Sequence, residues 1–174
     1  MRRALFVLAC AALCSGPLPA EAASKTYTDS TFFYSVDYPE SWRVRHVSKV
    51  TVIASPRESE EDRFSENVEI VAEDLSRQPE NITLLDYYRK AVASGTRLLQ
   101  DFKVLEEAQT VWADRDAVAN LYTMTDKGER FKRKTYTFMA GKTAYVLTYT
   151  AMAADYDDYL AKAERIMRSI RVSP

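Results

Sequence analysis

The sequence predicts a single α+β domain built on an antiparallel β-sheet flanked by helices. Segments rich in alternating or β-branched residues form two groups, one before and one after a helical segment. Short turns with glycine separate two of the later segments, as in antiparallel hairpins. A second amphipathic helical segment ends the chain. The order strands, helix, strands, helix is typical of a sheet with helices packed against it.

The first 22 of the 174 residues have the pattern of a secretory signal peptide. Two arginines precede an apolar run over residues 4–14, and residues 20–22 read Ala-Glu-Ala, which signal peptidase accepts. We therefore expect a signal peptide over 1–22, with cleavage after Ala23 as the alternative. A retained N-terminal anchor is a further alternative, although the apolar run is short for a membrane span.

Cleavage at this site would change the chemistry of the chain. It removes both cysteines, Cys10 and Cys14, so the mature protein would have no disulfide, thiolate metal ligand or cysteine nucleophile. Leu13 before Cys14 and the early position of Cys10 argue against a lipoprotein. The expected product is exported, periplasmic or secreted, and soluble after cleavage.

The strands of the first half are expected in chain order after a polar, flexible segment at 23–30. A strand over 32–38 ends at a turn around Pro39 and Trp42, and a second strand begins there. Two further strands, 50–55 and 67–74, flank the charged segment 57–66, which lacks a helical stripe and is expected to be an exposed loop.

The first helix is expected to begin at Thr83, because Asp86 three residues later completes a variant of the capping box. Its apolar face would comprise Leu84, Tyr88, Ala91, Val92 and Gly95.

The second half predicts an antiparallel meander and a final helix. After a start at 102–105, strands are expected over 116–124, 130–139 and 143–150, and the last, apolar on both faces, should be central. A helix over 155–171 follows, with acidic residues in its first turn and basic residues in its last, as the helix dipole favours. Its buried stripe would comprise Tyr156, Leu160, Ala163, Met167 and Ile170.

Four segments resemble the PsbP-like and DcrB-like domain superfamily. The segment from Phe33 to Trp42, with Tyr38-Pro39 inside it, is similar to the opening of these domains. Residues 64–68 (Phe-Ser-Glu-Asn-Val), 145–151 (Tyr-Val-Leu-Thr-Tyr-Thr-Ala) and 167–170 (Met-Arg-Ser-Ile) match later motifs in the same order. The resemblance covers 31–172, which we take as the domain.

This resemblance implies an α/β/α sandwich and a role in docking to other proteins. The superfamily includes the extrinsic PsbP subunit of photosystem II, exported bacterial envelope proteins and a Ran-binding nuclear import factor. We therefore expect an exported, non-enzymatic accessory module that docks onto a membrane-associated or envelope complex. In a photosynthetic host, a lumenal photosystem II subunit with a link to calcium is the alternative. Fold resemblance does not transfer function, so the residues must carry that argument.

Composition and motifs point away from catalysis and nucleic acid. The net charge is −1, whereas nucleic-acid-binding domains usually carry a basic excess. His46 is the one histidine, and the sequence has no metalloprotease, esterase, P-loop or dinucleotide-binding motif. We expect His46 on the surface and no enzyme activity, cofactor or metal site.

Two charged segments are the expected partner-docking residues. The acidic one lacks the glycine and ligand spacing of a calcium loop, although its carboxylates (with Glu66) are the available oxygen ligands. The basic one, around a hairpin, could meet an acidic protein or anionic lipid headgroups, or could be a charged sheet edge that prevents aggregation. These residues are Glu58, Glu60, Glu61, Asp62, Lys127, Arg130, Lys132 and Lys134.

A different class of function stays open, namely a small ligand-binding protein or hydrolase that uses a sheet–helix cleft. Paired carboxylates could perform acid–base chemistry there, with Asp37, Glu66, Glu69 and Asp116 as candidates. Aromatic side chains could line such a cleft, although they more often fill a core. The aromatic candidates are Tyr34, Tyr122, Tyr136 and Tyr149.

Overall fold

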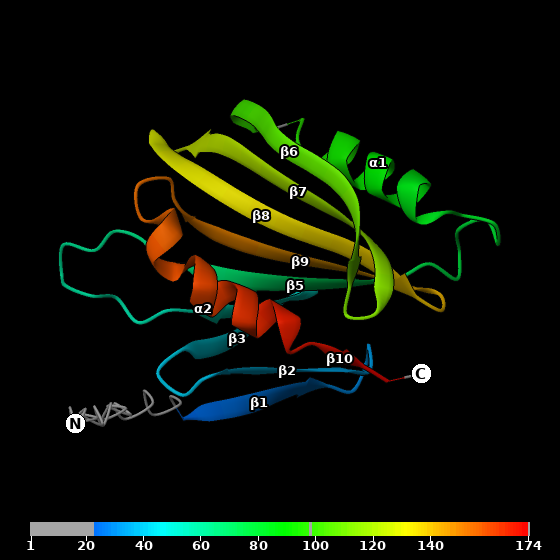
Figure 1. Cartoon of the computed structure of the whole chain (residues 1–174), viewed down its shortest axis with the longest axis horizontal. Coiled ribbons are helices and arrows are strands. Elements are labelled where there is room, and N and C mark those ends of the chain that lie inside the picture. Colours follow the sequence, from blue (N-terminus) through cyan, green and yellow to red (C-terminus); the bar gives the residue numbers. More distant parts are fainter. Residues whose placement is uncertain (1–22, 98, 174) are drawn as a thin grey trace, which may run out of the picture.

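The computed structural model describes residues 23–97 and 99–173, so the predicted signal peptide lies outside the described residues. Two antiparallel sheets and two helices make up this part of the chain, which confirms the α+β prediction (Figure 1). The elements are β1 (Ser24–Asp29), β2 (Tyr34–Pro39), β3 (Arg43–Val47), β4 (Val50–Ala54), β5 (Asn67–Asp74), α1 (Leu84–Gly95), β6 (Gln100–Trp112), β7 (Arg115–Asp126), β8 (Glu129–Ala140), β9 (Thr143–Met152), α2 (Tyr156–Arg168) and β10 (Arg171–Val172).

The larger sheet has seven strands in the order β3-β4-β5-β9-β8-β7-β6. The strand β9 lies at its centre, as its apolar residues on both faces predict. Leu147 of β9 is fully buried and pairs with Ile70 on one side and Tyr136 on the other. At the β7–β8 turn, Gly128 has a φ of 84°, a left-handed conformation that glycine adopts without strain.

The smaller sheet, in the order β1-β2-β10, corrects the expectation of a flexible segment at 23–30. β1 pairs with β2 over six residues, from Ser24 opposite Pro39 to Asp29 opposite Tyr34. Its polar composition resembles a loop because β1 is an edge strand whose side chains are mostly exposed. Main-chain pairing with β2, which no local pattern reports, orders the segment.

The connection from β1 to β2 corrects the start of the strand predicted over 32–38. Phe32 and Phe33 lie in a turn, and β2 begins at Tyr34. The side chain of Asp29 accepts hydrogen bonds from the main-chain N–H of Thr31 (2.8 Å) and of Phe32 (2.9 Å). This local side-chain capping competes with the strand ladder and stabilises the turn.

The two helices cover opposite faces of the larger sheet. The core residues of β9 show this, since successive side chains of a strand alternate between the two faces. Tyr145, Leu147 and Tyr149 belong to the main core with α2. Ala144 and Val146 belong to a smaller cluster that contains Tyr87 of α1. In Figure 1, α2 crosses in front of the large sheet and lies next to the small one.

Both helices differ in part from their predicted faces. The capping box of Thr83 and Asp86 is confirmed, but α1 buries Tyr87 and Tyr88 and leaves Ala91 and Gly95 exposed, since mainly its first half packs on the sheet. In α2, Tyr159 and Ile166 are buried in addition to most of the predicted stripe, of which Leu160 is half-buried and Ile170 lies beyond the end of the helix at Arg168. The reason is that α2 contacts β2, β5 and β9, so its buried face is wider than a single stripe. Neither helix among the described residues has the length and apolarity needed to cross a bilayer.

Candidate functional site

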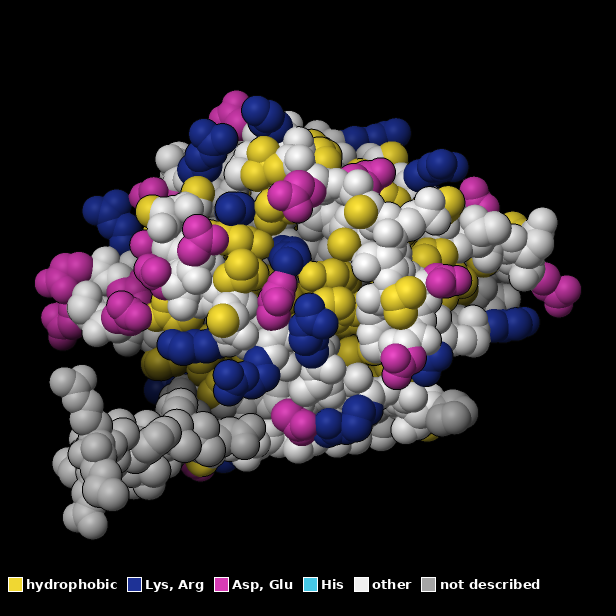
Figure 2. Space-filling view, viewed as in Figure 1, with side chains coloured by type: hydrophobic (Ala, Val, Ile, Leu, Met, Phe, Trp, Pro, Cys, Tyr) yellow, Lys and Arg dark blue, Asp and Glu magenta, His cyan; other side chains and the backbone are white. Residues whose placement is uncertain are grey.

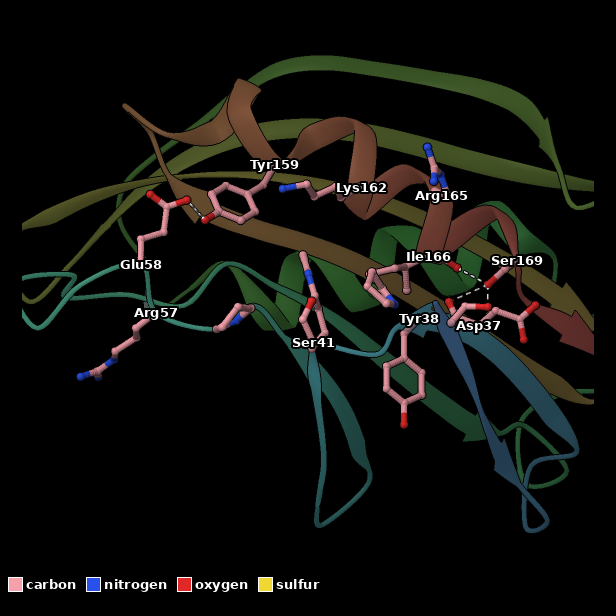
Figure 3. A pocket seen from close by; sticks show the side chains of 14 residues that line it. Asp37, Tyr38, Ser41, Arg57, Glu58, Tyr159, Lys162, Arg165, Ile166 and Ser169 are labelled. Atoms are coloured by element: carbon pink, nitrogen blue, oxygen red, sulfur yellow. Dashed lines mark hydrogen bonds between the residues drawn. The ribbon is translucent and has the colours of Figure 1, made fainter. Parts of the chain in front are cut away.

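A cavity of about 630 Å³ lies between α2, the β2–β3 connection and the segment after β4 (Figure 3). We call it the α2 cleft. The helix α2 and its C-terminal cap contribute one wall, and residues 37–42 and 56–58 contribute the opposite side. Its lining residues are Ser24, Asp37, Tyr38, Pro39, Ser41, Trp42, Pro56, Arg57, Glu58, Tyr159, Lys162, Arg165, Ile166 and Ser169.

The floor of the α2 cleft is apolar and well packed. The ring centroids of Trp42 and Tyr159 are 6.4 Å apart, and only 5% and 8% of these residues are exposed. Ile166 beside them is 1% exposed. The N–H of Trp42 donates to the carbonyl oxygen of Pro39 (2.9 Å), which fixes the turn that carries the indole. These contacts hold the floor in place before any ligand binds.

One end of the cleft lies beside polar contacts that β2 makes with its neighbours β10 and β1. Arg171 donates two hydrogen bonds to Asp37, from Nη1 to Oδ2 (2.7 Å) and from Nη2 to Oδ1 (2.9 Å). Thr26 donates to the same carboxylate (2.7 Å). The hydrogen bonds from Arg171, and then from Thr26, lower the pKa of Asp37 to about 2. Asp37 is therefore ionised and already paired.

The other end of the cleft holds Glu58. Its carboxylate accepts a hydrogen bond from the hydroxyl of Tyr159, as Figure 3 shows, and its N–H donates to Asp62 (3.0 Å). Burial raises the pKa of Tyr159, and the hydrogen bond and charge of Glu58 raise it further. The second acid of the cleft is thus also engaged by a protein group.

The rim of the α2 cleft carries three cations, Arg57, Lys162 and Arg165, all exposed. Within the described part of the chain, none of them forms an ion pair. Lys162 extends along α2, with its Nζ 5.0 Å from the ring centroid of Tyr159, and the arginine head groups point outward (Figure 3). Figure 2 shows Lys and Arg side chains, with Asp and Glu side chains among them, around apolar surface in the centre of this face.

The predicted acidic docking residues do not act as one cluster. Glu58 lines the cleft, whereas Glu60 and Glu61 are exposed in the loop. Asp62 accepts hydrogen bonds from the N–H of Glu58 and of Phe64 (both 3.0 Å), so it shapes the loop. Glu66 is buried and accepts a hydrogen bond from Ser55 (3.2 Å), and burial raises its pKa. Across the described residues, no group of three or more His, Cys, Asp or Glu could hold a metal ion.

The predicted basic docking residues divide between exposed and half-buried positions. Lys127 and Arg130 are exposed near the β7–β8 turn. Lys132 lies 4.1 Å from the ring centroid of Tyr156, and Lys134 pairs with Glu164 of α2 (2.5 Å). The alternative of a charged sheet edge is wrong, because β8 lies between β7 and β9.

The structure brings the acidic loop and the basic hairpin together, although they are more than 60 residues apart. Nη1 of Arg63 lies 3.2 Å from Oε1 of Glu129. The rings of Phe64 and Phe131 pack with centroids 4.8 Å apart. The two segments therefore form one end of the molecule rather than separate surfaces.

The carboxylates proposed for acid–base chemistry are separated. Asp37 lines the cleft and is paired with Arg171, and Glu66 is buried next to Ser55. Glu69 and Asp116 do not line the α2 cleft.

The four tyrosines proposed for a pocket do not line the α2 cleft either. Tyr34, Tyr136 and Tyr149 are in the core, and Tyr122 packs on Phe102 with ring centroids 5.2 Å apart. His46 is exposed, as expected, and its Nδ1 lies 3.1 Å from the hydroxyl oxygen of Thr51.

The sequence analysis missed most of the cleft. Tyr159, Lys162 and Ile166 follow one another at helical spacing, which is a second apolar and basic stripe next to the predicted one. Trp42 was expected only as a turn anchor. A search for an aromatic, a cationic and an aliphatic residue at i, i+3 and i+7 on the last helix could have found this wall.

No protein-family model matches the sequence, and no curated protein matches it. Solved structures do match. The cyanobacterial PsbP (CyanoP) of Synechocystis sp. PCC 6803 superposes with a TM-score of 0.65 at 15% identity, covering 92% of this chain and 99% of that one. PA94 of Pseudomonas aeruginosa, a putative regulator of unknown function, gives 0.62 at 14% identity, with coverages of 87% and 98%. LpqN of Mycobacterium tuberculosis, involved in cell envelope biogenesis, gives 0.57 at 13% identity, with coverages of 87% and 91%.

These neighbours establish the fold. The described chain has a PsbP-like α+β fold, as the four sequence motifs predict. At 12–15% identity such likeness concerns the fold alone.

Proposed function

We propose that this protein is an exported, non-catalytic PsbP-like module that docks onto a membrane-associated or envelope protein complex, with the α2 cleft as its docking site. The observation that carries the proposal is the cleft itself. It combines a preformed apolar floor with a charged rim, which is the composition of a recognition site.

The chemistry of the cleft favours binding over catalysis. A general base must be free to accept a proton and must have a pKa near the working pH. The pKa of Asp37 is about 2, and its oxygens are occupied by Arg171 and Thr26. One oxygen of the Glu58 carboxylate accepts the hydrogen bond from Tyr159. Asp37 is therefore not poised to activate water, and Glu58 is already in contact with a protein donor.

Export is the second part of the proposal. It rests on the signal-peptide pattern of residues 1–22 and is in keeping with the fold. Two structures with this fold are a cyanobacterial PsbP and a protein of cell envelope biogenesis. A photosystem II role remains the alternative for a photosynthetic host.

A small ligand is the second candidate occupant of the cleft, favoured by its volume. Small-molecule pockets span roughly 300–1,000 Å³, and about 630 Å³ falls within that range. The cleft is also a sheet–helix cleft, as this alternative expects. A small ligand and a protein partner differ in the size of the product that a crosslinker captures.

Site-specific photocrosslinking in the organism of origin tests the proposal. A photoreactive amino acid replaces Ser41, which is exposed and lines the cleft, or Lys142, which is exposed in the β8–β9 turn and serves as the control. We expect one dominant protein adduct from position 41 and no such adduct from position 142. Equal adducts at both positions, or none at position 41, would refute docking at the cleft. A reproducible mass increase of the protein crosslinked at position 41 that is too small for a second protein would instead support the small-ligand candidate.

A further inference from the structure

We propose that the segment recognised by the α2 cleft is an acidic peptide segment of the partner that carries one bulky apolar side chain. This inference rests on the proposed function and specifies the chemistry of the occupant. The apolar side chain would occupy the floor, and acidic residues on either side of it would meet the cations of the rim.

The floor provides the site for the apolar side chain. Trp42, Tyr159 and Ile166 line the cleft at one point, and the small parts of them that stay exposed are aromatic and aliphatic. Pro39 and Pro56 border the same cavity and add apolar surface that has no N–H. Burying an aromatic or leucine side chain here removes mainly the partner's apolar surface from water, and well-packed pockets of this kind hold the hot spots of interfaces.

The charge around the floor selects the flanking residues. Both acids of the cleft are engaged, Asp37 by Arg171 and Glu58 by Tyr159. The three cations of the rim have no ion-pair partner among residues 23–97 and 99–173. The hydrogen bond from the neutral Tyr159 hydroxyl leaves Glu58 its negative charge, so the cleft carries three unpaired cations against one carboxylate and its balance is positive. A basic segment would be repelled by this balance, whereas an acidic one would be attracted.

The placement of the cations favours a peptide over an amphiphile with a single headgroup. Lys162 and Arg165 stand on the α2 wall, and Arg57 stands on the segment opposite. A ligand with one anionic group can approach one wall at a time. A peptide with acidic residues on both sides of its apolar residue can approach both walls together, so it uses all three cations.

Fluorescence polarisation with nine synthetic peptides tests this inference. Each labelled, end-blocked heptapeptide has a central Trp, Leu or Gly, flanked on both sides by Glu, Gln or Lys. With the purified protein we expect Glu-flanked Trp and Leu peptides to bind at least about fivefold more tightly than their Gln-flanked counterparts, since each exposed ion pair contributes little. Peptides with central Gly should bind too weakly to detect. Binding of the Glu-flanked peptides should weaken as salt is raised, because the cations are exposed.

Charge-reversed variants supply the decisive comparison. In Lys162→Glu/Arg165→Glu we expect the preference for Glu over Lys flanks to reverse. The matched control, Lys142→Glu/Arg89→Glu, makes the same charge change at exposed positions outside the cleft and should keep the wild-type order. Circular dichroism confirms that both variants fold.

Three results would overturn the inference. They are equal or tighter binding of Lys-flanked peptides to the wild-type protein, an unchanged order in Lys162→Glu/Arg165→Glu, and no measurable binding of any peptide. If the crosslink from position 41 still forms in any of these cases, the docking proposal stands and only the acidic chemistry is rejected. If the crosslink fails as well, both proposals are rejected.

Discussion

Arg171 and Asp37 form a two-pronged ion pair, although they are 134 residues apart in the chain. The pair joins the last strand, β10, to β2 next to the α2 cleft. Ser169 reinforces the same junction, because its hydroxyl oxygen accepts a hydrogen bond from the N–H of Asp37 (2.8 Å). Together, the ion pair and the Ser169 hydrogen bond link the small sheet to the end of α2 and leave Asp37 unavailable to a ligand.

Replacing Asp37 by asparagine should reduce stability in a pH-dependent way. The folded-state pKa of Asp37, about 2, is below its ordinary value of 3.8, so its ionisation stabilises the fold above pH 3.8 and the contribution is lost as the pH falls toward 2. Both side chains are partly exposed, so we expect Asp37→Asn to cost about 0.5–1 kcal/mol at pH 7. Urea unfolding at pH 7 and at pH 2.5 measures the change, which should shrink at the lower pH. Arg171→Gln should cost a similar amount, and the double variant should cost little more than either. A cost for Asp37→Asn that does not depend on pH would contradict the pairing.

Ionisation of the buried Glu66 should lower the stability of the fold, whereas ionisation of Asp37 raises it. Burial raises its folded-state pKa above 4.5, so the folded protein holds the proton more tightly and ionisation costs stability as the pH rises past 4.5. We therefore expect Glu66→Gln, which can still accept the hydrogen bond from Ser55, to be more stable than the wild type at pH 7 and equally stable near pH 4. Urea unfolding at the two pH values is the measurement. The exposed control Glu60→Gln should leave the free energy of unfolding unchanged at both pH values. If Glu66→Gln were less stable than the wild type at pH 7, burial would not destabilise the ionised carboxylate, and the prediction would be wrong.

Two matched leucine substitutions should separate the core from the sheet edge. Leu147 of the central strand β9 is fully buried, whereas Leu105 of the edge strand β6 is 43% exposed. Leu147→Ala removes buried contacts and leaves a cavity, so we expect a loss of about 2–5 kcal/mol in the free energy of unfolding. Leu105→Ala should cost less than about 1 kcal/mol. Comparable losses in chemical denaturation would mean that β6 is covered by a partner or a second copy in solution.

Removing the cap of α1 should destabilise that helix locally. The hydroxyl oxygen of Thr83 accepts a hydrogen bond from the N–H of Asp86 (3.1 Å), and the carboxylate of Asp86 accepts one from the hydroxyl of Thr83 (2.6 Å). We expect Thr83→Ala to cost about 0.5–2 kcal/mol of helix stability. Faster amide exchange over residues 84–90, with the central strand β9 unchanged, would confirm the local effect. Thr31→Ala, at an exposed turn position, is the control and should leave exchange in α1 as it is.

Local patterns in the sequence were sufficient for most strands and for the start of α1. Val68 and Ile70 alternate with partly exposed neighbours and are buried as predicted, because the two-residue period of a strand is visible in any short window. The cap at Thr83 is equally local. The fold class and the PsbP-like resemblance follow from the order of such segments.

Pairing between distant segments could not be predicted from such local patterns. The strand β1 has an unremarkable polar sequence, and only its main-chain hydrogen bonds with β2 make it a strand. The wide buried face of α2 depends on its position against two sheets, which its own sequence does not report.

The sequence by itself determined the class of this protein: an α+β chain with a signal-peptide pattern, balanced charge, and a single histidine. The tertiary structure alone decided which charges are available. It turned Lys134 toward Glu164 and Asp37 toward Arg171, and it left Lys162 and Arg165 beside the apolar floor of the α2 cleft. The physical reason is that a charge is compensated by an opposite charge only when the two lie within a few ångströms of each other. In a folded chain such neighbours come from distant parts of the sequence.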